Sequence, residues 1–147
     1  MNPVISRLLI FGVALLSLRV IAADDVTAFK KLSGTPIFAF GGIGFAGTTS
    51  EGEIAFKTVV TSDSAEADFL RLLKSGNPQA KCYALVGLRM TNRPAFIEQA
   101  RAFASSNLEV QTCAGCMMAR QPVSSVVASI QRGDYDEQAR SKPSRAR

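Results

Sequence analysis

The sequence predicts a mainly α-helical domain of short antiparallel helical hairpins, with an irregular glycine-rich N-terminal segment and one or two short strands. Apolar residues recur with helical spacing in several segments of about twelve residues. Asn-Pro start signals and glycine stop signals separate these segments, which leaves short loops between them. Short loops place consecutive helices side by side and antiparallel. The 147 residues fit one compact domain.

Residues 1–22 have the features of a secretory signal peptide in their usual order. Arg7 supplies the positive charge, residues 8–18 are apolar, and small residues follow as far as Ala22 and Ala23. The apolar run is shorter than the ~20 residues that a membrane-spanning helix needs. We therefore expect cleavage near Ala22 or Ala23, export to the periplasm or the medium, and no transmembrane segment in the mature chain.

The basic character of the chain belongs to its two ends. Lys and Arg number 17 against 12 Asp and Glu, but two of the basic residues lie in the predicted signal peptide. Four more lie in residues 140–147, which contain no acid. This pattern predicts a helical domain over residues 23–133 and a basic, disordered tail over 134–147. Without interleaved aromatic residues, the tail does not indicate nucleic-acid binding.

The first part of the predicted domain has weak secondary-structure signals. Residues 26–32 suit a short helix, and residues 37–40 suit a short strand or a buried extended segment. Ser50 and Glu53 have capping-box spacing, which predicts a helix start. Residues 51–60 also alternate tolerably as a strand, although the helical interpretation is favoured.

Three helices are predicted more firmly, over residues 63–74, 78–89 and 94–105. The middle one is apolar almost all round, which is typical of a helix buried on most sides. A short strand is expected next, followed by a last helix that starts at Pro122 and ends at Gly133.

The run Gln79–Leu88 resembles the inner helix of HEAT-type repeats, and the resemblance covers residues 63–106. It implies stacked hairpins and a protein-binding surface on the ridge of the three helices. The run Phe40–Glu53, placed after a signal peptide, resembles small exported bacterial proteins without an assigned function. That second resemblance implies no catalytic residues.

Gly42, Gly44 and Gly47 match the G-x-G-x-x-G pattern of dinucleotide-binding loops. The apolar run before them is too short for the usual strand, and no alternation of strands and helices follows. A tightly turning structural loop is therefore the favoured interpretation. Binding of an anion at a helix N-terminus near Ser50 is the second one.

Cys113 and Cys116 form a C-x-x-C pair that is open to four interpretations, one of which is that the thiols stay reduced and inert. In an oxidising compartment, two of Cys82, Cys113 and Cys116 are expected to form a structural disulfide, which is the favoured interpretation. A redox pair would use Cys113 for attack and Cys116 for resolution. With Met117 and Met118 the pair offers soft ligands for Cu(I), but no metal site is expected.

The absence of histidine excludes His-based nucleophiles, His general bases and His metal ligands. The sequence therefore predicts a non-enzymatic exported interaction or envelope module, stabilised by a disulfide. We expect it to bind a protein partner and no cofactor. The alternative is a thiol-disulfide redox protein that uses Cys113 and Cys116.

Overall fold

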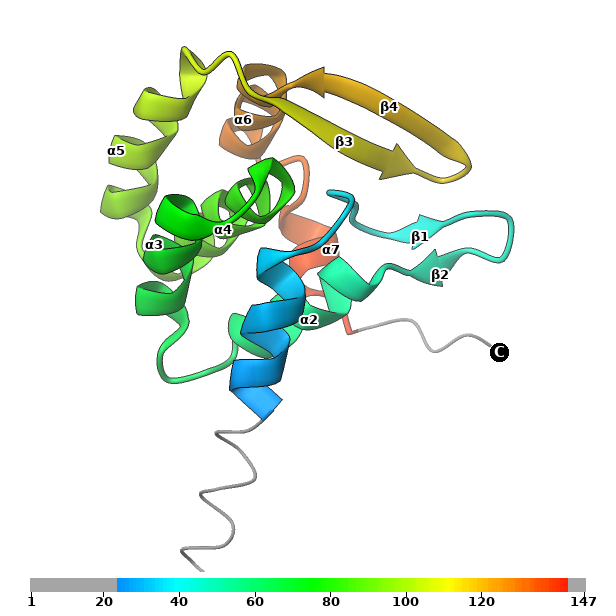
Figure 1. Ribbon diagram of the computed structural model, residues 1–147, viewed down its shortest axis with the longest axis horizontal. Helices are drawn as coiled ribbons and strands as arrows, with labels where there is room; N and C mark the ends of the chain where they lie inside the picture. Colours follow the sequence, from blue (N-terminus) through cyan, green and yellow to red (C-terminus); the bar gives the residue numbers. More distant parts are fainter. Residues whose placement is uncertain (1–23, 143–147) are drawn as a thin grey trace, which may run out of the picture.

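The computed structural model describes residues 24–142, so the predicted signal peptide and the end of the predicted tail lie outside the described residues. The chain is mainly helical with two small antiparallel strand pairs, which confirms the predicted class (Figure 1). After a helix over residues 24–33, the elements are β1 (Gly42–Ile43), β2 (Thr48–Thr49), α2 (Glu51–Val59), α3 (Ala65–Ser75), α4 (Pro78–Thr91), α5 (Arg93–Ala104), β3 (Glu109–Ala114), β4 (Met117–Pro122), α6 (Val123–Arg132) and α7 (Asp136–Arg140). None of the described helices is both long and apolar enough to cross a bilayer.

Helix α4 forms the centre of the core, as its apolar sequence predicts. It contacts α3, α5, α6 and β3. Its residues from Cys82 to Leu88 are all buried. Because α4 is enclosed on these sides, it does not form an exposed ridge together with α3 and α5. The expected binding ridge over the three helices is wrong in this part.

Two asparagines start the helices α4 and α5. The Asn77 side chain accepts a hydrogen bond from the Ala80 amide at 2.8 Å. Asn92 does the same for the Ala95 amide at 3.0 Å, and it alone separates α4 from α5. Each side chain satisfies an amide that the first helical turn leaves unpaired. Both predicted helix starts are confirmed to within one residue.

The ambiguous segment after the glycine run is helical and forms α2. Ser50 caps it by accepting a hydrogen bond from the Glu53 amide at 3.0 Å. Glu53 does not complete a capping box, because its Oε2 accepts a hydrogen bond from the Gly41 amide at 2.8 Å. Its Oε1 binds the Lys57 ammonium. Glu53 is buried, and its bond to the Gly41 amide fixes the chain before β1 against α2.

Tyr83 on α4 provides the central polar contact of the core. Its hydroxyl donates to the Ala39 carbonyl at 2.6 Å and accepts from the Ala39 amide at 3.0 Å. The Ser50 hydroxyl lies 3.4 Å from the same oxygen. The Tyr83 ring packs edge-to-face on Phe38 and Phe40, at centroid distances of 4.9 and 5.2 Å. Burial raises the pKa of Tyr83 to about 12.

Strand β3 lies between β4 and the extended segment that contains Phe38. Phe38 donates to the Gln111 carbonyl at 2.8 Å and accepts from the Cys113 amide at 3.2 Å. The expected strand over residues 37–40 is therefore a single bridge to β3. The expected strand after α5 exists as β3, but its partner β4 was not predicted.

The predicted disordered tail over residues 134–147 is wrong in its first part, which forms α7. The αL conformation of Gly133, with φ of 87°, ends α6 as predicted and turns the chain back onto the domain. Arg89 on α4 pairs with Asp136, with 3.0 Å between Nε and Oδ1. Ala139 is buried in the core. These long-range contacts make α7 part of the folded unit.

The packing of α4 against α3 can be tested at Gly87. A Cβ at this position would lie 2.3 Å from the Phe69 ring. We expect Gly87→Ala to lower the free energy of unfolding by about 2 kcal/mol, as overpacking does. In the matched control, Gly34→Ala, the nearest atom is the Lys30 carbonyl oxygen at 3.9 Å, and stability should stay the same or rise. Urea unfolding measures both, and equal stabilities would contradict this packing.

The Tyr83 hydroxyl can be tested with Tyr83→Phe. At neutral pH the variant should lose about 1–3 kcal/mol, because the buried Ala39 amide loses its partner and the Ala39 carbonyl keeps only the Ser50 hydroxyl at 3.3 Å. The pKa of Tyr83 is about 12 when folded against 10.0 for a free tyrosine, so the wild type loses stability as pH rises between these values. The difference between the two proteins should therefore shrink over that range. Denaturant unfolding at several pH values measures it, and a difference independent of pH would contradict the burial.

Candidate functional site

The two motifs that the sequence singled out lie next to each other. Ile43 in the glycine-rich hairpin is bridged to Gly115 of the C-x-x-C hairpin, and the Gly44 amide donates to the Gly115 carbonyl at 2.9 Å. Figure 1 shows both hairpins at the same end of the molecule, away from α3 and α5. We call residues 42–49 together with 109–122 the hairpin end.

The glycine-rich motif is the turn of the first hairpin. Gly44 and Gly47 bound its four-residue loop and have φ values of 69° and 60°, which favour glycine. A Cβ on Gly42 would lie 2.9 Å from the Gly47 carbonyl oxygen across the hairpin. A dinucleotide site needs such a loop between a strand and a helix, whereas this loop joins two strands. The geometry agrees with the interpretation of this motif as a tightly turning loop without a ligand.

The Ser50 side chain is not available to bind an anion. Its side chain is buried and caps α2. The hydroxyl also donates to the Ala39 carbonyl at 3.3 Å. Glu51 and Glu53 add two carboxylates to the first turn of α2. Their negative charge opposes the binding of an anion at this helix start.

The C-x-x-C motif forms the tip of the second hairpin. Gly115 and Cys116 are the two loop residues, and Gly115 has φ of 56°, as the first position of a tight hairpin turn favours. Cys113 lies on β3 directly opposite Met118 on β4. Redox-active C-x-x-C pairs are commonly activated by a helix that begins at the first cysteine. The next helix, α6, begins only after β4, so that contribution is not available.

The expected disulfide is wrong. All three cysteines lie within the described residues, and all are free. Cys82 lies on α4 inside the core, where burial raises the pKa of its thiol to about 12. Cys113 and Cys116 lie at the tip of the hairpin formed by β3 and β4. Cys82 is fully buried, whereas Cys116 is exposed.

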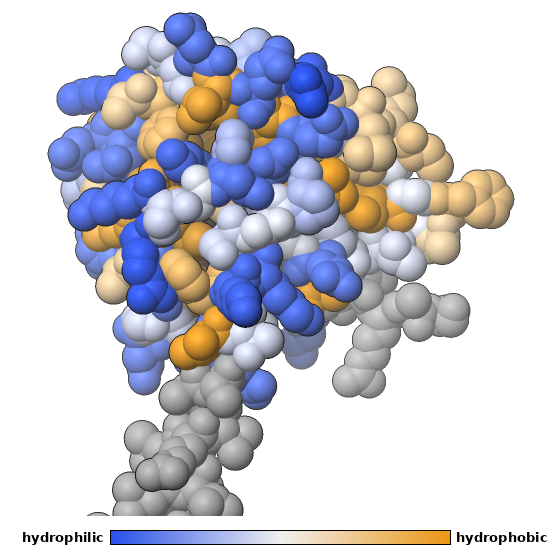
Figure 2. Space-filling model, viewed as in Figure 1, coloured by the Kyte–Doolittle hydropathy of each residue, from blue (hydrophilic) through white to orange (hydrophobic). Residues whose placement is uncertain are grey.

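The hairpin end carries large apolar side chains that solvent reaches. Phe45 in the first turn is fully exposed, and Met117 and Met118 are 77% and 62% exposed. Figure 2 shows apolar surface gathered over this end of the molecule. This surface was not predicted from the sequence. The signal was the position of Phe45 between glycines, because a residue at such a loop tip has no neighbour to pack on.

Strand β4 is an open edge. The main-chain groups of Gln111 and Cys113 bond to Phe38 on the far side of β3. Main-chain groups alternate in direction along an antiparallel pair. Arg120 lies opposite Gln111, and Met118 lies opposite Cys113. The amides and carbonyls of Arg120 and Met118 therefore point away from β3, outward from β4. Sequence reasoning missed β4 because its residues do not alternate in polarity.

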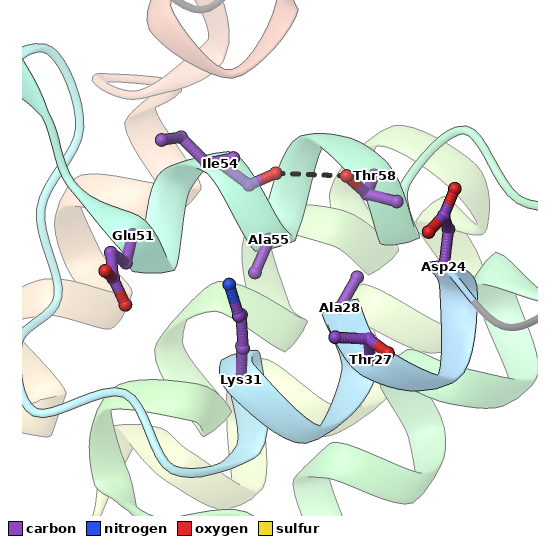
Figure 3. A pocket seen from close by; sticks show the side chains of 8 residues that line it. All are labelled: Asp24, Thr27, Ala28, Lys31, Glu51, Ile54, Ala55 and Thr58. Atoms are coloured by element: carbon purple, nitrogen blue, oxygen red, sulfur yellow. Dashed lines mark hydrogen bonds between the residues drawn. The ribbon is translucent and has the colours of Figure 1, made fainter.

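A groove of about 350 Å³ lies between the helix over residues 24–33 and α2 (Figure 3). Lys31 points into it from the first helix, and Glu51 lies at one end on α2. Its lining residues are Asp24, Thr27, Ala28, Lys31, Glu51, Ile54, Ala55 and Thr58. The mixed charges and small side chains are typical of a shallow seam between two packed helices.

Comparison with known proteins identifies no relative: no protein-family model, curated protein or solved structure matches the chain. Among the described residues, no group of three or more His, Cys, Asp or Glu side chains is placed to hold a metal ion. The hairpin end combines exposed apolar side chains, an open strand edge and two accessible thiols. Its chemistry is suited to binding.

The positions of the thiols can be tested by labelling. In the native protein, Cys113 and Cys116 should react readily with an aromatic disulfide reagent, whereas Cys82 should react only after unfolding. Mass mapping of the labelled peptides identifies each site. Cys113→Ser with Cys116→Ser is the matched control and should leave a native protein that does not react. Rapid native labelling of Cys82 would contradict its burial.

Proposed function

We propose that the chain is an exported, non-enzymatic interaction module that binds an extended segment of a partner protein along β4. The main support is the open edge of this strand, where the main-chain groups of Met118 and Arg120 point outward. An extended peptide can pair with such an edge as an added strand. Main-chain hydrogen bonds would then give affinity, and side-chain contacts would give selectivity.

The side chains of β4 suit this mode of binding. Exposed strand edges are commonly protected by charged residues, proline or bulges. Arg120 and Pro122 protect the second half of β4, whereas Met117, Met118 and Ala119 leave the first half apolar. Methionine adapts its shape to different apolar partners. Phe45 on the neighbouring hairpin extends the same apolar surface.

Export is part of this proposal and rests on the sequence of residues 1–22. Their charged, apolar and small-residue regions favour a periplasmic or secreted protein. The expected disulfide is no longer part of the proposal.

A thiol-disulfide redox protein is the second candidate, favoured by the exposure of Cys116 and the partial exposure of Cys113. In that reaction the Cys113 thiolate attacks a substrate disulfide, and Cys116 then displaces the product thiol as both cysteines oxidise to a disulfide. A dithiol donor would have to reduce the pair again. Catalytic reduction of insulin in the presence of dithiothreitol, lost in Cys113→Ser, would favour this candidate over the interaction module.

Strand addition can be tested with proline at position 120. Peptides of about ten residues, selected from a displayed library against the protein, serve as the probe. Arg120→Pro removes an outward amide but no bond to β3, so it should weaken peptide binding about tenfold while the fold is retained. Arg120→Ala is the matched control, because it removes the side chain and its exposed 3.7 Å ion pair with Glu109 but keeps the amide. It should bind peptide like the wild type.

Fluorescence anisotropy of labelled peptide measures the affinities, and circular dichroism checks the fold of each variant. Equal binding by Arg120→Pro and the wild type would overturn strand addition along β4. A loss that is equal in Arg120→Pro and Arg120→Ala would assign the effect to the side chain and would also overturn it. A library that yields no peptide competing at β4 counts against the proposal as well.

A further inference from the structure

Three sulfur-bearing side chains belong to residues at the tip of the second hairpin. Cys113 and Cys116 supply two free thiols, and Met118 supplies a thioether directly opposite Cys113. We propose that this tip is a binding site for one soft monovalent metal ion, Cu(I), held by the thiolates of Cys113 and Cys116 and by the sulfur of Met118. This inference concerns metal binding and does not depend on strand addition along β4.

The strand register brings these side chains to one side of the hairpin. Directly opposite residues in an antiparallel pair have Cβ atoms about 4.5–5.5 Å apart, so Cys113 and Met118 are neighbours. The Cys113 Sγ also lies 3.5 Å from the Gly115 carbonyl oxygen, which places it over the turn that carries Cys116. Cys116 is exposed, so its side chain is free to rotate toward this point. Met117 projects to the opposite face of the hairpin.

The chemistry of the ligands selects the metal. Thiolate and thioether ligands favour Cu(I), whereas zinc sites are usually completed by four Cys, His or carboxylate ligands. The chain contains no histidine. No cluster of three or more His, Cys, Asp or Glu side chains suitable for a metal occurs within residues 24–142. A hairpin tip with two thiols and one thioether therefore fits a soft ion that needs few ligands.

Binding at this site is an exchange of protons for metal and involves no electron transfer. Each thiol loses its proton to solvent, and each sulfur forms a bond to copper. Met118 contributes a lone pair and loses nothing. The copper enters and remains as Cu(I), so no oxidant or reductant is consumed.

The experiment is an anaerobic titration of the purified chain with Cu(I) in competition with bicinchoninate, whose copper complex is coloured. We expect one Cu(I) per chain to be withdrawn from the indicator. The double variant Cys113→Ser with Cys116→Ser should not withdraw copper, although it retains the Cys82 thiol. Circular dichroism should show an unchanged fold, because both positions lie at the solvent-exposed tip of the hairpin.

Two methionine variants form the matched control pair. Met118→Leu should weaken Cu(I) binding about tenfold, a loss of about 1.4 kcal/mol. Met117→Leu changes the same kind of residue on the opposite face and should leave the affinity unchanged. Failure of the wild type to compete with bicinchoninate would overturn the site. Copper binding retained by the double cysteine variant, or weakened equally by both methionine changes, would overturn it too.

Discussion

The bond between the Tyr83 hydroxyl and the main chain of Ala39 is the contact on which the arrangement of the molecule depends. One phenol satisfies both the amide and the carbonyl of a residue 44 positions away. Buried main-chain groups need such partners. The bond fixes the segment around Phe38 against α4, and Phe38 in turn pairs with β3 while Glu53 holds the Gly41 amide. Both hairpins are therefore positioned from inside the helical core.

The helical part could be predicted because its signals are local. Asn77 and Asn92 accept hydrogen bonds from amides three residues ahead, and Gly133 adopts the left-handed conformation that ends a helix. These interactions depend on nearby residues, so the sequence alone reveals them. The burial of α4 was predictable for a related reason, since a helix that is apolar on nearly every side has to be surrounded.

The hairpin end and the C-terminus could not be predicted, because they depend on contacts between distant residues. Strand β4 lacks alternation, and its place is set by pairing with β3 across the turn at Gly115. Helix α7 is held by Asp136, which pairs with Arg89 on α4. Cysteine spacing likewise does not say which thiols meet, so the expected disulfide was wrong. The thiol pair itself was found, but its placement beside the glycine-rich hairpin was not.

The enclosure of Cys82 makes the order of folding and oxidation matter for this chain. Thiol–disulfide exchange needs a thiolate that can reach a sulfur atom in line. Burial in the folded core keeps the Cys82 thiol protonated and out of reach of another sulfur atom. A chain that closes its core before it meets an oxidant keeps this thiol for its lifetime. A chain oxidised while still extended can bridge Cys82 to one of the other cysteines, and α4 then cannot assume its place. Rapid association of the helices, which local contacts favour, thus protects the molecule kinetically against a covalent error.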